Sequence, residues 1–166
     1  KTHGETLKWR ELSAAAGRPW IVSLDEIGPF DIGVTEDRID SNHDEVRKQA
    51  LWANLMAGGA GVEWYFGYDT ISHDLNTEDW RTREAMWDYT RYALDFFQTH
   101  LPFTQMAPMD SLTLTPNDYV FADPDSVIAL YLPVGDTVQI TLPAAEYSVA
   151  WFNPRTGGDI LADDST

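Results

Sequence analysis

The chain has 166 residues, enough for one ordinary domain or two small ones. Hydrophobic residues make up 43% of it, so we expect a folded protein rather than a disordered one. Lys and Arg number 11 against 27 Asp and Glu, and the resulting net charge of −16 repels phosphate backbones and anionic lipids. We therefore expect neither nucleic acid nor a membrane as a partner, although acidity that serves only solubility is an equal alternative.

The chain contains no cysteine, which excludes disulfides, thiolate nucleophiles and thiolate metal sites. No stretch approaches ~18 consecutive apolar residues, so none is expected to span a bilayer. The four histidines are scattered without the spacing of metal ligands, and we predict no metal and no cofactor. The chain starts at Lys1 without an initiator Met or a signal peptide, and we expect it to be a fragment of a longer protein.

The first hundred residues alternate between predicted helices and strands. Gly17 ends the first helix and Gly58–Gly59 the second, while Asn42 and Glu45 have the spacing of a capping box and Thr77 is the predicted cap of the third. In order, the elements are a helix over 5–16, a strand over 20–24, a helix over 42–57, a strand over 61–68 and a helix over 80–99. This alternation predicts parallel strands, and two such strands cannot by themselves close a barrel.

After Pro102 the pattern changes to short runs of β-type residues separated by turn signals such as Asp123-Pro124 and Gly157-Gly158. The runs cover 119–122, 127–132, 137–142 and 148–152. Their even spacing predicts a small antiparallel sandwich. The predicted fold class is therefore α/β plus all-β, with one domain over 1–102 and a second over 103–166.

The strand predicted over 20–24 runs directly into Asp25 and Glu26 and then a Gly-Pro turn. A charge beside a core strand is costly unless it is paired or used, and the catalytic groups of an α/β barrel lie at the C-terminal ends of its strands. Neighbouring strand residues point to opposite faces, so only one of the two acids can aim into a barrel. The residues leave open a functional Glu26, a functional Asp25, and a structural acid bound by backbone amides.

Residues 19–29 (PWIVSLDEIGP) resemble the seventh strand of clan A glycoside hydrolases, where the nucleophilic Glu is followed by an apolar or aromatic residue and Gly. Residues 44–52 and 56–68 are similar to a bacterial subset with an apiosidase-like barrel. Residues 151–158 (WFNPRTGG) resemble a signature of the collagen-binding-type β-sandwich that follows this barrel. The resemblance implies the last strands and helices of a (β/α)8 TIM barrel followed by a small antiparallel β-sandwich.

This resemblance implies a retaining glycoside hydrolase of plant or algal poly- or oligosaccharides, secreted or periplasmic in a bacterium. Such enzymes need two carboxyl groups about 5–5.5 Å apart. The resemblance makes Glu26 the nucleophile and places the acid/base on a fourth strand outside this chain. The fragment would need the N-terminal part of the barrel, on the same polypeptide or a companion chain, to be active.

Four further residues are candidates for binding the carbohydrate substrate. Trp64 would stack under the reacting sugar, with a plain core position as the alternative. Glu63 would bind a sugar hydroxyl or tune Glu26. His73, in the loop after the second strand, would contact substrate, and Asp25 would sit beside Glu26 facing a cation or a helix end. The alternative for Glu63 is a buried ion pair with one of three arginines, Arg47, Arg81 or Arg83.

Two non-catalytic readings also fit the sequence. Residues 103–166 would be a carbohydrate- or matrix-binding module, or the barrel would be a scaffold that has lost catalysis. Acids at 69, 74, 78 and 79 gather in the second loop, where they would hold Ca²⁺ or simply be solvated.

Overall fold

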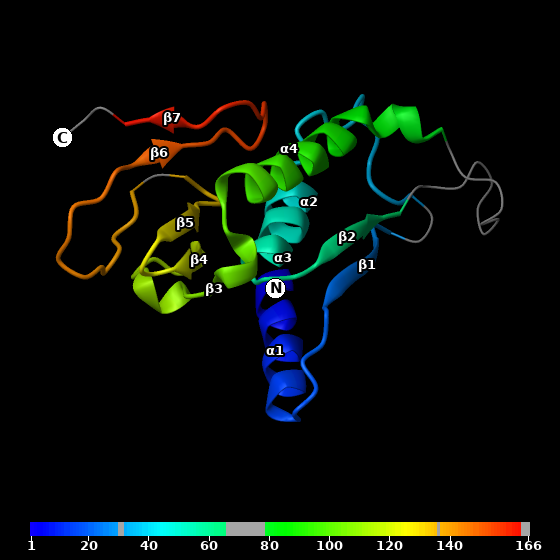
Figure 1. The fold of residues 1–166 in the computed structure, drawn as a ribbon. Helices are drawn as coiled ribbons and strands as arrows, with labels where there is room; N and C mark the ends of the chain where they lie inside the picture. Colours follow the sequence, from blue (N-terminus) through cyan, green and yellow to red (C-terminus); the bar gives the residue numbers. More distant parts are fainter. Residues whose placement is uncertain (30–31, 66–78, 136, 164–166) are drawn as a thin grey trace. The chain divides into compact units, whose positions relative to one another are not determined.

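We describe residues 1–29, 32–65, 79–135 and 137–163 of a computed structural model. The chain forms two compact units, Lys1–Asp88 and Tyr89–Thr166, and the division falls within the helix α4, which spans Glu84–His100 (Figure 1). Each unit combines helix with β-structure. They are described separately below.

The first unit follows the predicted order of helix, strand, helix, strand and helix. Its elements are α1 (Thr2–Ala15), β1 (Ser23–Ile27), α2 (Asp44–Val46), the π-helix η1 (Arg47–Trp52), α3 (Ala53–Met56), β2 (Gly61–Trp64), the 3₁₀-helix η2 (Trp80–Arg83) and the start of α4. β1 and β2 pair in parallel, with Ser23 opposite Gly61. The parallel pairing predicted from the alternation is confirmed.

Both helix ends predicted at glycines are confirmed, and both have the same geometry. Gly17 adopts a φ of +78°, its N–H bonds the carbonyl of Ala14 at 2.9 Å, and the next N–H bonds the carbonyl of Ser13 at 3.0 Å. Gly58, with a φ of +72°, ends α3 through the same pair of backbone bonds. Each is a Schellman motif, which needs a left-handed residue that glycine supplies without strain.

The predicted capping box at Asn42 is wrong. The N-cap of α2 is His43, in a left-handed conformation, and its N–H bonds Oδ1 of Asp40 at 3.0 Å. The carboxylate of Asp40 therefore binds the N–H of the N-cap residue itself, and no side chain caps the first turn of α2. The helix that follows also departs from α geometry, because Arg47–Trp52 is a π-helical turn.

β1 begins three residues later than predicted and contains both acids rather than ending before them. The reason is that Trp20 is still tied to α1, through its N–H and Oγ of Ser13 at 3.0 Å, and the ladder to β2 starts only where the carbonyl of Val22 accepts from Ala60 N–H. At the third helix, Asp79 caps η2 by accepting from Arg81 N–H. The predicted cap Thr77 and the end of the predicted second strand, 66–68, lie outside the described residues.

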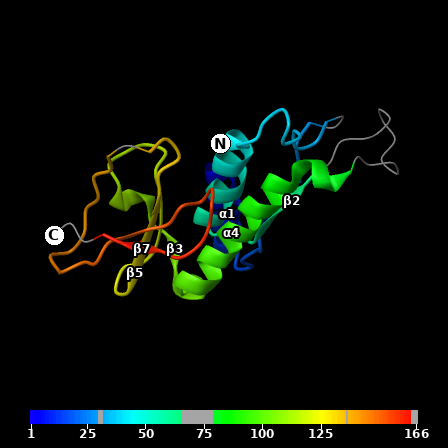
Figure 2. The ribbon, with the colours of Figure 1, turned by 90° about the horizontal axis from the view of Figure 1, so that it is seen from above.

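The helix α1 packs on α3 through polar groups rather than apolar ones. Its buried residues are His3, Thr6 and Ser13. Nδ1 of His3 lies 2.8 Å from the carbonyl of Ala53, and the hydroxyl of Thr6 donates to Oδ1 of Asn54 at 2.9 Å. The amide of Asn54 then donates to the carbonyl of Gly61 at 2.8 Å, which ties both helices to β2. In Figure 2 the cyan α2–α3 segment lies in front of the blue α1, which it contacts.

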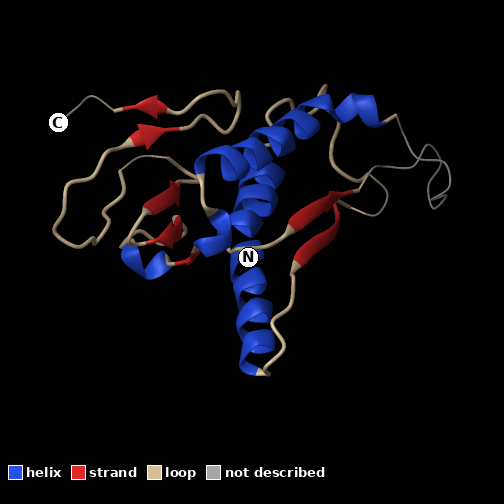
Figure 3. Cartoon of the chain, viewed as in Figure 1, coloured by secondary structure: helices blue, strands red, loops and turns tan. Residues whose placement is uncertain are grey.

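The second unit is mostly loops with short strands (Figure 3). Its elements after α4 are η3 (Phe103–Gln105), β3 (Ala107–Pro108), η4 (Asp110–Leu112), β4 (Tyr119–Asp123), β5 (Val127–Tyr131), β6 (Ala150–Trp151) and β7 (Leu161–Ala162). The antiparallel sheets are β3-β4-β5 and β6-β7. The strand predicted over 137–142, all of which the structure describes, is reduced to one bridge between Thr113 and Ile140.

Candidate functional site

The pairing of β1 with β2 is interrupted at Glu26. Leu24 lies opposite Val62, but the next recorded pair is Ile27 with Trp64, so Asp25 and Glu26 together face the single residue Glu63. This is a β-bulge, and Glu26 within it has a φ of +49°. A left-handed conformation costs a residue other than glycine roughly 1–2 kcal/mol, and bulges re-aim side chains. Glu26 is therefore held in an unfavourable backbone conformation at the C-terminal part of β1.

The carboxyl groups of Asp25 and Glu63 meet across the two strands. A side-chain hydrogen bond to Asp25 is the main cause that raises the pKa of Glu63, followed by the negative charge of Asp25, desolvation and the charge of Glu26. A neighbouring carboxyl group disfavours the ionised form of a carboxylate, so Asp25 favours the protonated form of Glu63. Glu63 therefore binds its proton more tightly than an isolated glutamate does.

The face of the sheet that carries this pair is open. Ser23, Asp25 and Glu63 are exposed, and they line a shallow pocket together with Leu24, Gly61 and Val62. Because side chains alternate along a strand, Trp64 points to the opposite face, where η1 and α3 contact β2. Asp25 thus shares the open face with Glu63, which differs from the expectation of a position facing a helix end.

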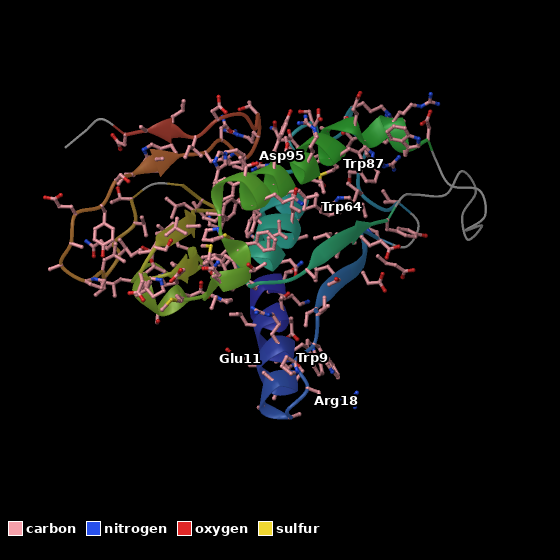
Figure 4. The ribbon with its side chains drawn as sticks, viewed as in Figure 1. Trp9, Glu11, Arg18, Trp64, Trp87 and Asp95 are labelled. Atoms are coloured by element: carbon pink, nitrogen blue, oxygen red, sulfur yellow. The ribbon has the colours of Figure 1, made fainter. Side chains whose placement is uncertain are left out.

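Trp64 is 8% exposed, so its ring lies in the core of the first unit (Figure 4). Burial of the ring corresponds to the core alternative that the sequence left open. Stacking on a sugar would require the ring to be presented to solvent, and in this structure the helix-covered face of β2 conceals it.

The three arginines considered as partners of Glu63 contact other groups. Arg47, which is 2% exposed, donates to the carboxylate of Asp44, and Arg81 pairs with Asp79 at 2.7 Å. The hydrogen bond from Arg81 lowers the pKa of Asp79. His73 and the acids at 69, 74 and 78 lie outside the described residues.

The third arginine, Arg83, holds the loop that follows β1. Its buried guanidinium donates through Nε to the carbonyl of Val34 at 2.6 Å and through a terminal nitrogen to the carbonyl of Ile32 at 3.2 Å. Val34 N–H in turn bonds the carbonyl of Tyr65, just after β2, at 2.7 Å. This arginine therefore fixes the segment that borders the C-terminal ends of both strands.

Asp37 makes a second connection of the same kind. Its carboxylate accepts from Nε2 of His43 at 2.7 Å and from the N–H of Ala85 at 3.0 Å, while its own N–H bonds the carbonyl of Thr82. Sequence reasoning missed both connections, because each joins residues more than forty positions apart and no local motif marks such a contact. His43 is fully buried.

No protein-family model, curated protein or solved structure matches this chain. Within the described ranges, no group of three or more His, Asp or Glu side chains is placed to hold a metal ion. In the same part of the chain, no helix is both long and apolar enough to cross a membrane. The arguments about function below therefore depend on the geometry of β1 and β2.

Proposed function

We propose that this chain carries the nucleophile of a retaining glycoside hydrolase, and that the nucleophile is Glu26. The observation that carries the proposal is the left-handed backbone of Glu26 at a β-bulge. Strained residues of this kind cluster at active sites, where the surrounding structure stabilises a conformation that the mechanism uses. The location fits as well, since Glu26 lies near the C-terminal end of a parallel strand.

The reaction begins when a carboxylate oxygen of Glu26 attacks the anomeric carbon of a sugar. A bond forms between that oxygen and the anomeric carbon while the bond to the leaving oxygen breaks, and a general acid protonates the departing oxygen. Water then hydrolyses the glycosyl-enzyme ester. The raised pKa of Glu63 favours its protonated form, in which the carboxyl group can donate to a sugar hydroxyl beside Glu26.

The rest of the active site would come from further parallel strands. Sheets of parallel strands are normally covered on both faces, whereas the face that carries Asp25 and Glu63 is exposed. The N-terminal part of a (β/α)8 barrel, on the same polypeptide or a companion chain, would cover it and supply the acid/base. On this proposal the enzyme acts on plant or algal polysaccharides outside the bacterial cytoplasm, without a cofactor.

The test is covalent labelling with 2-deoxy-2-fluoro glycosyl fluorides or dinitrophenyl glycosides. Their leaving groups depart without help from an acid, so labelling asks only whether a nucleophile is present. We expect a stable ester whose mass maps to Glu26 by peptide sequencing, and none in Glu26→Gln. The matched control Asp25→Asn should still be labelled. A label on Asp25 or Glu63 would reassign the nucleophile. Absence of any label across a panel of common pyranosides, with the N-terminal part of the barrel present, would refute the proposal.

A non-catalytic carbohydrate- or matrix-binding module is the second candidate, and one observation favours it. Trp151, on the β6–β7 ribbon, is 56% exposed, and Leu161 opposite it is 68% exposed. Exposed apolar side chains that adjoin each other are typical of binding surfaces. Retention of the chain on insoluble polysaccharides, lost in Trp151→Ala while labelling at Glu26 fails, would favour this candidate over the hydrolase.

A further inference from the structure

Two tryptophans lie side by side on the surface at the other end of β1 from Glu26. Trp9, on α1, is 44% exposed, and Trp20, in the turn before β1, is 58% exposed. Their rings are nearly parallel, with 15° between the planes and 6.3 Å between the centroids. Next to Trp20, Ile21 is 87% exposed. A contiguous apolar patch of this kind usually marks an interaction site.

The position of the two rings is fixed by α1. Ser13 lies four residues after Trp9, so both are on one face of the helix. The hydroxyl of Ser13 accepts from the N–H of Trp20 at 3.0 Å and donates to the carbonyl of Arg10, which brings Trp20 over that face. The Schellman motif at Gly17 closes the turn between them. The rings are thus arranged before any ligand arrives.

The N-terminal segment that contains Trp9 and Arg18 has a charge opposite to that of the rest of the protein. Residues 1–18 contain four Lys or Arg and two Glu, a net charge of +2, and because the whole chain carries −16, the remainder carries −18. The ammonium of Lys8 lies 5.1 Å from the centre of the Trp9 ring. Figure 4 shows Trp9 and Arg18 near the same end of α1, with Glu11 on the other side of the helix.

Arg18 is exposed, and among the described residues no carboxylate is recorded in an ion pair with it. A guanidinium binds a carboxylate through two parallel hydrogen bonds, and an indole ring offers a broad apolar face. A sugar ring that carries a carboxylate can use both at once, with its C–H face on the indole and its carboxylate on the guanidinium. A neutral sugar would use only the ring, and the acidic remainder of the chain restricts favourable contacts with an anionic saccharide to this basic segment.

We propose that Trp9, Trp20 and Arg18 form a binding site for a uronic acid residue of an acidic saccharide. The site lies before β1, whereas Glu26 lies near its end, so the site anchors a chain of sugars away from the proposed active site. Binding is measured without turnover, so the outcome does not depend on whether Glu26 is a nucleophile.

The experiment compares a β-1,4-linked mannuronate tetramer with the mannose tetramer of the same linkage, which differs only in having CH₂OH in place of the carboxylate. Calorimetry measures the affinity, and two-dimensional NMR of the indole N–H groups locates the binding site. We expect the uronate to bind and to shift the NMR signals of Trp9 and Trp20. Its affinity should fall as salt screens the charge. Trp20→Ala should weaken binding about tenfold, and Arg18→Gln about three- to fivefold for the uronate alone.

Two control variants separate this site from general effects of charge and aromatic exposure. Trp80→Ala removes another tryptophan that is 54% exposed, and Arg91→Gln removes an arginine that lies over a tyrosine ring, so both should leave the uronate affinity unchanged. Equal affinity for the two tetramers would overturn the carboxylate specificity. Tighter binding of a thymidine tetranucleotide would assign the surface to base stacking, and absence of binding by all three ligands would refute the site.

Discussion

The guanidinium of Arg83 and the carbonyl of Val34 form a 2.6 Å hydrogen bond across 49 residues of sequence. Arg83 is 2% exposed and Val34 is also 2% exposed, so the bond is shielded from water. It connects the end of η2 to the loop that follows the strained Glu26. The conformation of the residues after β1 thus depends on a side chain contributed from beyond β2.

Replacing Arg83 by Met should lower the free energy of unfolding by roughly 2–4 kcal/mol, because buried carbonyls lose a charged donor. Urea denaturation measures the loss, and hydrogen exchange should show the N–H of Val34 exchanging faster. The matched variant Arg81→Met removes an arginine that is 71% exposed and should lower the free energy of unfolding much less than Arg83→Met does. If the free energy of unfolding fell equally in the two variants, the buried hydrogen bond of Arg83 would not contribute to stability.

The hydrogen bond between Glu63 and Asp25 should make stability depend on pH. The pKa of Glu63 is raised above its ordinary 4.5, so the folded state binds this proton more tightly than the unfolded state does. Its stabilisation is complete below pH 4.5 and is lost as the pH rises through the raised pKa. Glu63→Gln keeps a neutral side chain at every pH, so it should match the wild type in acid and exceed it in stability at pH 7.

Urea unfolding at pH 4 and pH 7 tests this expectation. Glu11→Gln makes the same change of net charge on the exposed side of α1, so it corrects for the overall acidity of the chain. The difference between the two variants should grow between the two pH values. If both variants gained stability equally with pH, the contact between Glu63 and Asp25 would not be the source of the pH dependence.

Gly58→Ala should destabilise the protein by about 1–3 kcal/mol, because Gly58 has a φ of +72° and an added methyl would meet the guanidinium of Arg10. That guanidinium donates to the carbonyl of Ala57 at 2.6 Å, so moving it also removes a bond at the end of α3. Gly4→Ala, in α1 with open space around it, should instead stabilise by up to about 1 kcal/mol. Thermal unfolding of both variants checks the opposite signs.

In the second unit, Phe152→Ala should loosen the segment beside β6. The Phe152 ring lies 4.7 Å from that of Phe96 on α4, and the two are tilted by 35°. Aromatic pairs contribute about 0.5–1.5 kcal/mol beyond the area they bury. We expect faster hydrogen exchange in residues 149–163, while β4 and β5 keep their protection. Leu161→Ala, at a side chain 68% exposed, should leave exchange in β4, β5 and α4 unchanged; a uniform change in both variants would contradict a local role for Phe152.

Features that depend on one or two neighbouring residues could be predicted from the sequence. The helix ends at Gly17 and Gly58 could be predicted because a left-handed residue at a helix end has a strong sequence signature. The parallel pairing of β1 and β2 followed from the order of the elements. These predictions needed no knowledge of distant contacts.

Features that depend on distant partners could not be predicted. The predicted start of β1 is wrong because Trp20 is hydrogen-bonded to Ser13 and the strand begins only after it. The bulge at Glu26 can be recognised only once the register with β2 is known. The strand expected over 137–142 has the right composition, yet one bridge from Ile140 to Thr113 is all that pairs in this described segment. At the candidate site, the acids were named from the sequence, but the partnership of Asp25 with Glu63 was not.

The helix α1 turns its polar residues inward and leaves Trp9 and Leu12 in solvent. Little hydrophobic burial therefore drives its docking, and its attachment depends on a few hydrogen bonds to α3 that water can replace. During refolding α1 should dock after β1 and β2 have paired. In dilute denaturant it should undock before global unfolding. The first unit would then behave as a stable centre with a detachable N-terminal arm, and proteases would cut that arm first.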